Sequence, residues 1–144
     1  MLKIEIGQNN PVLRKKSLKI EEINGNIQKL AEDMLEIMEK NNGMGLSACQ
    51  IGKNVQLFVI PKNLSTHWAF VNPEITKLSK KTQIMEEGCL SLPNVFIPVK
   101  RAKSLKIKAL DKNGKQFKLK VKGLLSRVIQ HENDHLNGIL ITDK

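Results

Sequence analysis

A short segment near the end of the chain, His131-Glu132-Asn133-Asp134-His135, has the residue types and the spacing of a hydrolytic metal site. On an α-helix, positions i and i+4 lie on one face, so both imidazoles can reach a single metal ion. Glu132 lies beside them, where its carboxylate can take a proton from a water molecule at the metal. This HExxH segment therefore predicts metal-assisted hydrolysis.

A catalytic metal site normally has three protein ligands and one open position, so the segment needs a third ligand. One common pattern, HExxHxxGxxH, places a third histidine where this chain has Ile141, and no Glu follows His135. The third ligand must therefore lie upstream, where the candidates are His67, the acidic residues and the two cysteines. Cys89 is the best of these, because the glycine before it in the segment EGCLS allows close backbone approach. A thiolate with two imidazoles makes a plausible open metal site.

A glycine-containing segment, GMGLSACQ, occupies residues 43–50. It lacks the third glycine of the GxGxxG pattern and follows an expected helix rather than a strand, so it does not indicate a dinucleotide site. Its backbone N–H groups and the amide of Gln50 are instead suitable donors for an oxyanion. Cys49, directly before Gln50, is expected to be a packing thiol.

Three segments in this order and at these separations, GMGLSACQ, EGCLS and QHENDH, resemble the three motifs of peptide deformylases. The resemblance extends to PVLRKKS at residues 11–17, to LKIKALDKNGK and to GLLSRVIQHENDHLNG, and so covers most of the chain. It implies a metal-dependent hydrolase that removes the N-formyl group from the initiator methionine of nascent polypeptides and releases formate. Only nine residues follow His135, so we expect a short form, without the extended C-terminal helix that docks many bacterial members on the ribosome.

The resemblance also implies roles for particular residues. Three of them would be the ligands of one metal ion: Cys89, His131 and His135. Glu132 would be the acid and base of the reaction. Gln50 and the backbone N–H of Leu90 would form the oxyanion hole. The backbone at Gly43 and Gly45 would hold the peptide in an extended, strand-like form.

One face of the metal-binding helix is expected to line the pocket for the methionine side chain. Three residues lie seven, four and three positions before the first histidine of the motif: Leu124, Arg127 and Val128. Met44 would complete the wall from the glycine-containing segment. Because a charged side chain does not suit an apolar pocket, Arg127 is expected at its rim.

The implied cofactor is one divalent metal ion. The resemblance favours Fe(II), and the same Cys-His-His set would also accept zinc, nickel or cobalt. The implied partners are formyl-Met nascent peptides, with transient ribosome association. We expect a monomer in the cytoplasm of a bacterium, or in a host cytoplasm or an organelle if the gene is viral or organellar.

Two other functions agree with parts of the sequence. One is a different HExxH metallohydrolase, such as a short peptidase, although the missing downstream ligand argues against it. The other is a basic ribosome- or RNA-binding module with a structural metal, although the four intact chemical residues argue against it.

The composition shows a strong excess of basic residues, with a formal net charge of +10 and a pI near 9.7. Such a balance suggests polyanionic surroundings. However, of 24 basic residues only Arg14, Arg101 and Arg127 are arginine, and aromatic residues make up 3%. Base reading and stacking on single strands are therefore disfavoured, and we expect no specific DNA binding. No apolar run approaches the roughly 18 residues of a membrane span, so no membrane partner is expected.

The elements that must position these residues follow from hydrophobic periodicity. Apolar residues at steps of three and four between Ile27 and Met38 predict an amphipathic helix, capped by Asn24 or Asn26. Alternation and turn signals predict strands over residues 55–60, 68–71, 104–110 and 116–121, the second of them ending at Asn72-Pro73.

The same reading predicts a second helix from Leu124 to His135, and one catalytic domain over residues 1–144. The fold class is α+β, with mostly antiparallel strands around a central HExxH helix and an N-terminal amphipathic helix.

Overall fold

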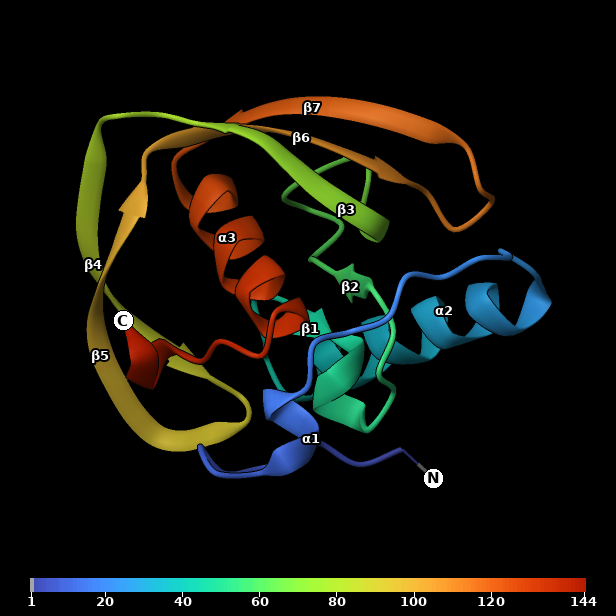
Figure 1. Cartoon of the computed structure of the whole chain (residues 1–144), viewed down its shortest axis with the longest axis horizontal. Helices are drawn as coiled ribbons and strands as arrows, with labels where there is room; N and C mark the ends of the chain where they lie inside the picture. The colour runs from blue at the N-terminus through green and yellow to red at the C-terminus, as the bar shows by residue number, and fades with distance from the viewer. Residues whose placement is uncertain (1) are drawn as a thin grey trace.

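The computed structural model describes residues 2–144. In chain order its elements are α1 (Pro11–Arg14), α2 (Gly25–Lys40), β1 (Leu46–Ser47), η1 (Ala48–Ile51), β2 (Leu57–Val59), β3 (Ala69–Leu78), β4 (Thr82–Cys89), β5 (Leu92–Ala102), β6 (Ser104–Leu110), β7 (Gln116–Lys122), α3 (Leu124–Leu136) and η2 (Ile141–Asp143). Five strands form one antiparallel sheet in the order β1-β2-β3-β6-β7, and β4 pairs with β5 in a separate hairpin (Figure 1). None of the helices between residues 2 and 144 is both long and apolar enough to span a membrane.

Helix α3 packs against one face of the larger sheet (Figure 1). Buried and exposed residues alternate along β6 and β7, so every second side chain points toward the core. Leu105, Ile107 and Phe117 from these strands join one buried cluster with Val128 and Ile129 of α3. This packing fixes the position of the helix that carries the HExxH residues.

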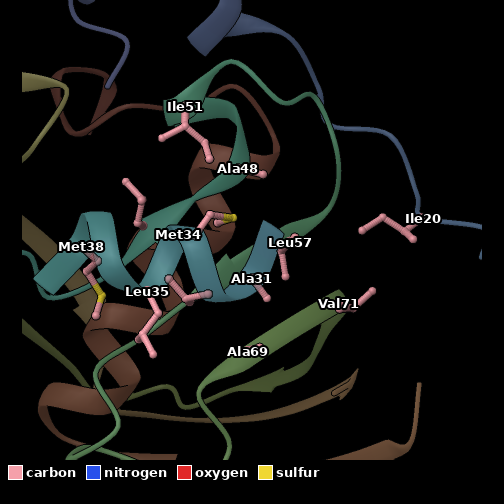
Figure 2. Close-up of a cluster of buried hydrophobic side chains, with 12 residues drawn as sticks. Ile20, Ala31, Met34, Leu35, Met38, Ala48, Ile51, Leu57, Ala69 and Val71 are labelled. Atoms are coloured by element: carbon pink, nitrogen blue, oxygen red, sulfur yellow. The ribbon is translucent and has the colours of Figure 1, made fainter. Parts of the chain in front are cut away.

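Helix α2 begins at Asn24, whose side-chain oxygen accepts hydrogen bonds from the backbone N–H groups of Asn26 and Ile27 at 3.0 and 3.3 Å. Its buried side, with Met34 and Met38, faces strands β1 and β2 in a second hydrophobic cluster (Figure 2). The helix ends at Lys40, and the chain then turns into β1 and η1. Helix α2 therefore supports the segment of residues 43–50 from one side.

The hairpin of β6 and β7 confirms the prediction for residues 104–121. The two strands pair from Ser104 with Lys122 to Leu110 with Gln116. In the turn, the side chain of Asp111 accepts hydrogen bonds from two backbone N–H groups, both at 2.9 Å.

Strand β3 is longer than the sequence predicts, because it continues across Asn72-Pro73 to Leu78. Asn72 has a φ of 48°, and the pairing of β3 with β6 shifts register between Val71 and Glu74. The side chain of Asn72 accepts a hydrogen bond from the Ile20 N–H at 2.8 Å and donates one to the Ile20 carbonyl at 2.7 Å. The expected strand end is therefore wrong, because a bulge accommodates the proline, which has no N–H to donate.

The β4–β5 hairpin was not predicted from the sequence. Most residues of β4 are exposed, so the strand shows no alternation between apolar and polar positions. Leu92 and Val99 of β5 pack with Leu13 and Leu140 in a third small cluster. The hairpin curves around the end of α3 (Figure 1) and brings Cys89 to that helix.

Candidate metal centre

Three side chains from β4 and α3 converge at one point. Nε2 of His135 lies 3.2 Å from Nε2 of His131 and 3.3 Å from Sγ of Cys89. All three donor atoms lie within 4.8 Å of one another, which makes them a candidate metal site. Of the other third-ligand candidates, His67 stacks on Phe117 instead, with ring centroids 3.9 Å apart.

The spacing of these donor atoms fits a four-coordinate cation. Tetrahedral bonds of about 2.05 Å to nitrogen and about 2.3 Å to sulfur separate two nitrogens by about 3.3 Å, and nitrogen from sulfur by about 3.6 Å. The observed separations of 3.2 and 3.3 Å are close to these values. Burial lowers the pKa of His135 well below its ordinary value, so its imidazole is neutral and keeps a lone pair for a cation. The residues present therefore fit one divalent metal ion.

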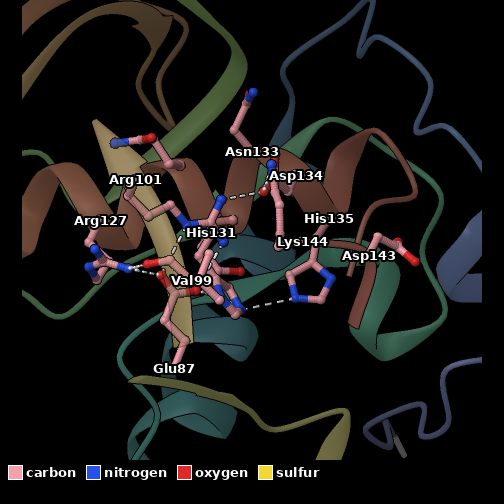
Figure 3. A network of polar contacts seen from close by, with 12 residues as sticks. Glu87, Val99, Arg101, Arg127, His131, Asn133, Asp134, His135, Asp143 and Lys144 are labelled. Carbon is pink, nitrogen blue, oxygen red and sulfur yellow. Dashed lines mark hydrogen bonds and ion pairs between the residues drawn. The ribbon is translucent and has the colours of Figure 1, made fainter. Parts of the chain in front are cut away.

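Glu87 of β4 orients the first histidine (Figure 3). Nδ1 of His131 donates a hydrogen bond to the Glu87 carboxylate at 3.0 Å, which leaves Nε2 as the ligand atom. Burial alone would raise the pKa of Glu87, but the hydrogen bonds from His131 and Arg101 lower it to about 2. Burial alone would lower the pKa of His131, but its contacts with Cys89 and Glu87 raise it to about 10.

Two arginines hold Glu87 in place (Figure 3). Nε and Nη2 of Arg101 donate to the Glu87 carboxylate at 3.0 and 2.9 Å, and Nη1 of Arg101 pairs with Asp134. Arg127 donates to Glu87 and to two backbone carbonyls of the β4–β5 hairpin, at 2.9 and 2.6 Å. Arg127 is therefore buried, and its expected position at the pocket rim is wrong. Its guanidinium compensates a buried carboxylate and ties α3 to the hairpin.

Glu132 is buried between α3 and the segment of residues 43–50. Its Oε1 accepts a hydrogen bond from the hydroxyl of Ser47 at 2.9 Å, and its Oε2 lies 3.9 Å from Nε2 of His131. Burial raises the pKa of Glu132, which suits a carboxyl group that must both take and return a proton. A Cβ atom at Gly45 would lie 2.6 Å from Oε2 of Glu132, so this position has room only for hydrogen.

Gln50 is buried in η1 with its amide nitrogen directed toward the donor atoms. Its Oε1 accepts a hydrogen bond from the Ser47 N–H at 2.9 Å, which fixes the orientation of the amide. Its Nε2 donates to Ser91 Oγ at 3.1 Å and lies 3.7 Å from Cys89 Sγ. The neighbouring Cys49 is fully buried, and burial raises the pKa of its thiol to about 12. Its thiol is therefore neutral at physiological pH.

A cavity of about 430 Å³ opens beside the donor atoms. All of the substrate-contact residues expected from the sequence line this cavity: Gly43, Met44, Gly45, Leu90, Leu124, Arg127 and Val128. The β4–β5 hairpin adds Phe96, a residue that is 64% exposed. An apolar wall beside a few polar groups is typical of a ligand pocket.

The sequence did not indicate roles for four residues of the site: Glu87, Ser47, Ser91 and Phe96. Glu87 precedes Cys89 by two residues, but the strand that carries both shows no alternation that would have indicated it. Ser47 and Ser91 lie inside the recognised motifs, but their hydrogen-bond partners are distant in the sequence.

A mixed fold of helices and antiparallel strands, with two histidines, a cysteine and a buried glutamate beside an open cavity, defines the class of metal-dependent hydrolases. Comparison with known proteins narrows this class, because residues 2–144 match the sequence model described as polypeptide deformylase. The chain belongs to the polypeptide deformylase family. The enzymes of this family remove the N-formyl group from nascent peptides.

Individual relatives agree with the family match. The chain is 48% identical to peptide deformylase 1 of Clostridium perfringens over 136 residues, which cover 94% of this chain and 92% of the relative. The crystal structure of peptide deformylase from Thermotoga maritima superposes with a TM-score of 0.95 at 38% identity, covering 100% of this chain and 97% of that one. A peptide deformylase from Synechococcus elongatus in complex with actinonin superposes with a TM-score of 0.94 at 36% identity, covering 99% and 77%.

Proposed function

We propose that residues 1–144 form one catalytic domain, in which the Cys89, His131 and His135 cluster and Glu132 remove the N-formyl group from the initiator methionine of nascent polypeptides. The observation that carries this assignment is that Cys89, His131 and Glu132 all line one cavity. The family to which the chain belongs performs this reaction. Formate and a free α-amine are the products.

The cofactor in this proposal is one divalent metal ion held by Cys89, His131 and His135. Fe(II) is favoured, and zinc, nickel or cobalt would suit the same ligands. When bound, the cation supplies Lewis-acid polarisation of the formyl oxygen and lowers the pKa of water. Glu87 contributes by accepting the Nδ1 proton of His131, so that Nε2 faces the cation.

Glu132 moves the proton in the proposed mechanism. Its carboxylate takes a proton from the attacking water as the water oxygen bonds to the formyl carbon. It then gives this proton to the amide nitrogen as the C–N bond breaks, so the residue ends in its starting state. The Ser47 hydroxyl holds Oε1 at 2.9 Å and leaves Oε2 on the side of His131. The raised pKa of Glu132 supports both transfers.

The oxyanion and the substrate are proposed to be held by the remaining motif residues. Nε2 of Gln50 and the backbone N–H of Leu90 would donate to the tetrahedral oxyanion. The peptide would lie in extended form along the backbone at Gly43 and Gly45. The apolar side chains of the cavity wall would receive the methionine: Met44, Leu124 and Val128. Arg127 would act indirectly, by fixing the hairpin that forms the opposite wall.

The substrate suggests where the protein acts. Formyl-Met termini are present on chains that are still being synthesised, so we propose transient association with ribosomes. We further propose that the protein is a monomer in the cytoplasm of a bacterium, or in a host cytoplasm or an organelle. Gel filtration and sedimentation with ribosomes would test these two points.

Formate release from a short formyl-Met peptide tests the proposed function. The protein should release formate from this peptide and leave the unformylated peptide of the same sequence intact. Cleavage of an internal peptide bond in the unformylated peptide would show a peptidase instead. Absence of both activities in the metal-loaded protein would contradict the proposal.

A further inference from the structure

The outer face of the larger sheet carries lysines at adjacent positions on three strands. Strand pairing places Lys77 of β3 opposite Lys106 of β6, and Lys106 opposite Lys120 of β7. In a second row, Lys108 of β6 lies opposite Lys118 of β7. Residues paired in this way have Cβ atoms about 4.5–5.5 Å apart. We call these five residues the lysine face.

A solvent-exposed sheet face favours polar side chains in general, but it does not require that neighbouring side chains carry the same charge. Like charges directly opposite one another destabilise a sheet. Lysines on an edge strand prevent edge-to-edge aggregation, and this reason suffices for β7. Strand β6, however, lies inside the sheet, between β3 and β7. Edge protection therefore leaves Lys106 and Lys108 unexplained.

Little negative charge compensates these lysines within the sheet. Glu74 of β3 lies 3.4 Å from Lys108, and strands β6 and β7 contain no acidic residue. The face is turned away from α3, which covers the other side of the sheet (Figure 1). The uncompensated charge therefore points to an anionic partner outside the chain.

We propose that the lysine face binds the phosphate backbone of helical RNA, and that this contact holds the enzyme on the ribosome; the second part rests on the proposed function. Lysine is a point charge that suits phosphates and reads no bases. Strands β6 and β7 expose no aromatic side chain on which single-stranded bases could stack. They also expose no large apolar side chain that would enter a membrane interface. Structured RNA fits these features better than a single strand or a lipid surface.

A hollow on the α3 side of β3 shares Lys77 with the lysine face. It has a volume of about 420 Å³ and is lined by three lysines: Lys77, Lys100 and Lys144. Asp134 also lines it, but its carboxylate pairs with Arg101 and lies 3.3 Å from Lys144. No residue of this hollow or of the lysine face lines the catalytic cavity. Helix α3 contributes to both the hollow and the cavity, but with different residues. RNA can therefore be bound here while a peptide enters the active site.

Two matched variants test the proposal in the full chain. The face variant changes Lys106, Lys108, Lys118 and Lys120 to Gln, and the control variant changes Lys15, Lys16, Lys19 and Lys53 to Gln, so both lose the same charge. Binding of a labelled 20-base-pair RNA duplex is measured by fluorescence anisotropy between 50 and 200 mM KCl. The face variant should bind at least about 10-fold more weakly at 50 mM, and its log–log salt slope should fall by about 3. The control variant should stay within about two-fold of the wild type.

Further readouts separate the outcomes. A variant with Arg at the four face positions keeps the charge and should bind RNA like the wild type, which distinguishes charge from folding. Sedimentation with ribosomes should decrease for the face variant only. Equal weakening of RNA binding in both Gln variants would overturn the proposal. Unchanged RNA binding by the face variant, together with lost binding to vesicles of 30% phosphatidylserine, would also overturn it. Formate release from a short formyl-Met peptide should be unchanged in both variants; its absence from the wild type would contradict the proposed function, not the lysine face.

Discussion

Gly45→Ala is the substitution whose effect the structure defines most closely. The added Cβ atom would lie 2.6 Å from Oε2 of Glu132 and 2.9 Å from both Cδ and Cγ of the same side chain. Ordinary van der Waals contacts begin near 3.4 Å, so the carboxylate must move by about 0.5–0.8 Å. Glu132 is buried and held by the Ser47 hydroxyl at 2.9 Å. The movement therefore has to break that hydrogen bond or shift the helix.

The magnitude follows from this displacement. Misplacing a catalytic group by about 1 Å can cost about 10²-fold in rate. We therefore expect kcat for formate release to fall by about 10²-fold in Gly45→Ala. Overpacking of a buried site costs about 1–3 kcal/mol, so the free energy of unfolding should decrease by an amount in this range. The protein should remain folded and retain its metal, because no ligand is changed.

Gly25→Ala is the matched control. Gly25 is the first residue of α2, and a Cβ atom there would meet nothing within 4 Å. Its kcat should equal that of the wild type, and its unfolding free energy should be equal or higher by up to about 1 kcal/mol. Both variants are assayed with formyl-Met peptide and by urea denaturation. Wild-type kcat in folded Gly45→Ala would refute the inference that Glu132 must occupy this position for catalysis.

Three further predictions concern the surroundings of the site. Arg127→Met should lower the unfolding free energy by about 3 kcal/mol in urea denaturation, because it removes a partner of the buried Glu87. The control Lys29→Met, on the surface of α2, should change the unfolding free energy by less than about 0.5 kcal/mol. Gln50→Ala should lower kcat by about 10²–10³-fold with unchanged metal content by mass spectrometry. Cys49 should resist iodoacetamide at pH 8 until urea unfolds the chain, because it is buried and its thiol pKa is raised to about 12. A loss of unfolding free energy below about 1 kcal/mol in Arg127→Met would contradict the first prediction, and a wild-type kcat in Gln50→Ala would contradict the second. Rapid alkylation of Cys49 in the folded protein would contradict the third.

The parts of the fold that depend on local patterns could be predicted from the sequence. The β6–β7 hairpin follows from strict alternation and an Asn-Gly turn, and both arms were placed to within about one residue. Strand β3 shows the limit of such patterns. Asn72-Pro73 is a local stop signal, but hydrogen bonds between Asn72 and the distant Ile20 turn it into a bulge. Tertiary contacts override the local signal there.

In the candidate site, too, local patterns predict some residues, whereas others depend on contacts between distant segments. The HExxH spacing places two imidazoles together by helical geometry alone, whereas Cys89 comes from a hairpin whose exposed residues carry no periodic signal. Arg127 was expected at a rim because a charged side chain does not suit an apolar pocket. Its partner Glu87 lies 40 residues away, on an element that was not predicted. A buried ion pair between distant segments leaves no local pattern, so only the structure reveals it.

The most direct test of the catalytic account is anaerobic formate release by Fe(II)-loaded protein, measured in parallel for the wild type and Glu132→Gln. The substitution keeps the size of the side chain and removes the carboxylate that we propose transfers the proton. The account predicts formate release from formyl-Met peptide by the wild type, and a rate at least about 10²-fold lower for Glu132→Gln at equal iron content. An undiminished rate in Glu132→Gln, or no formate from the iron-loaded wild type, would contradict it.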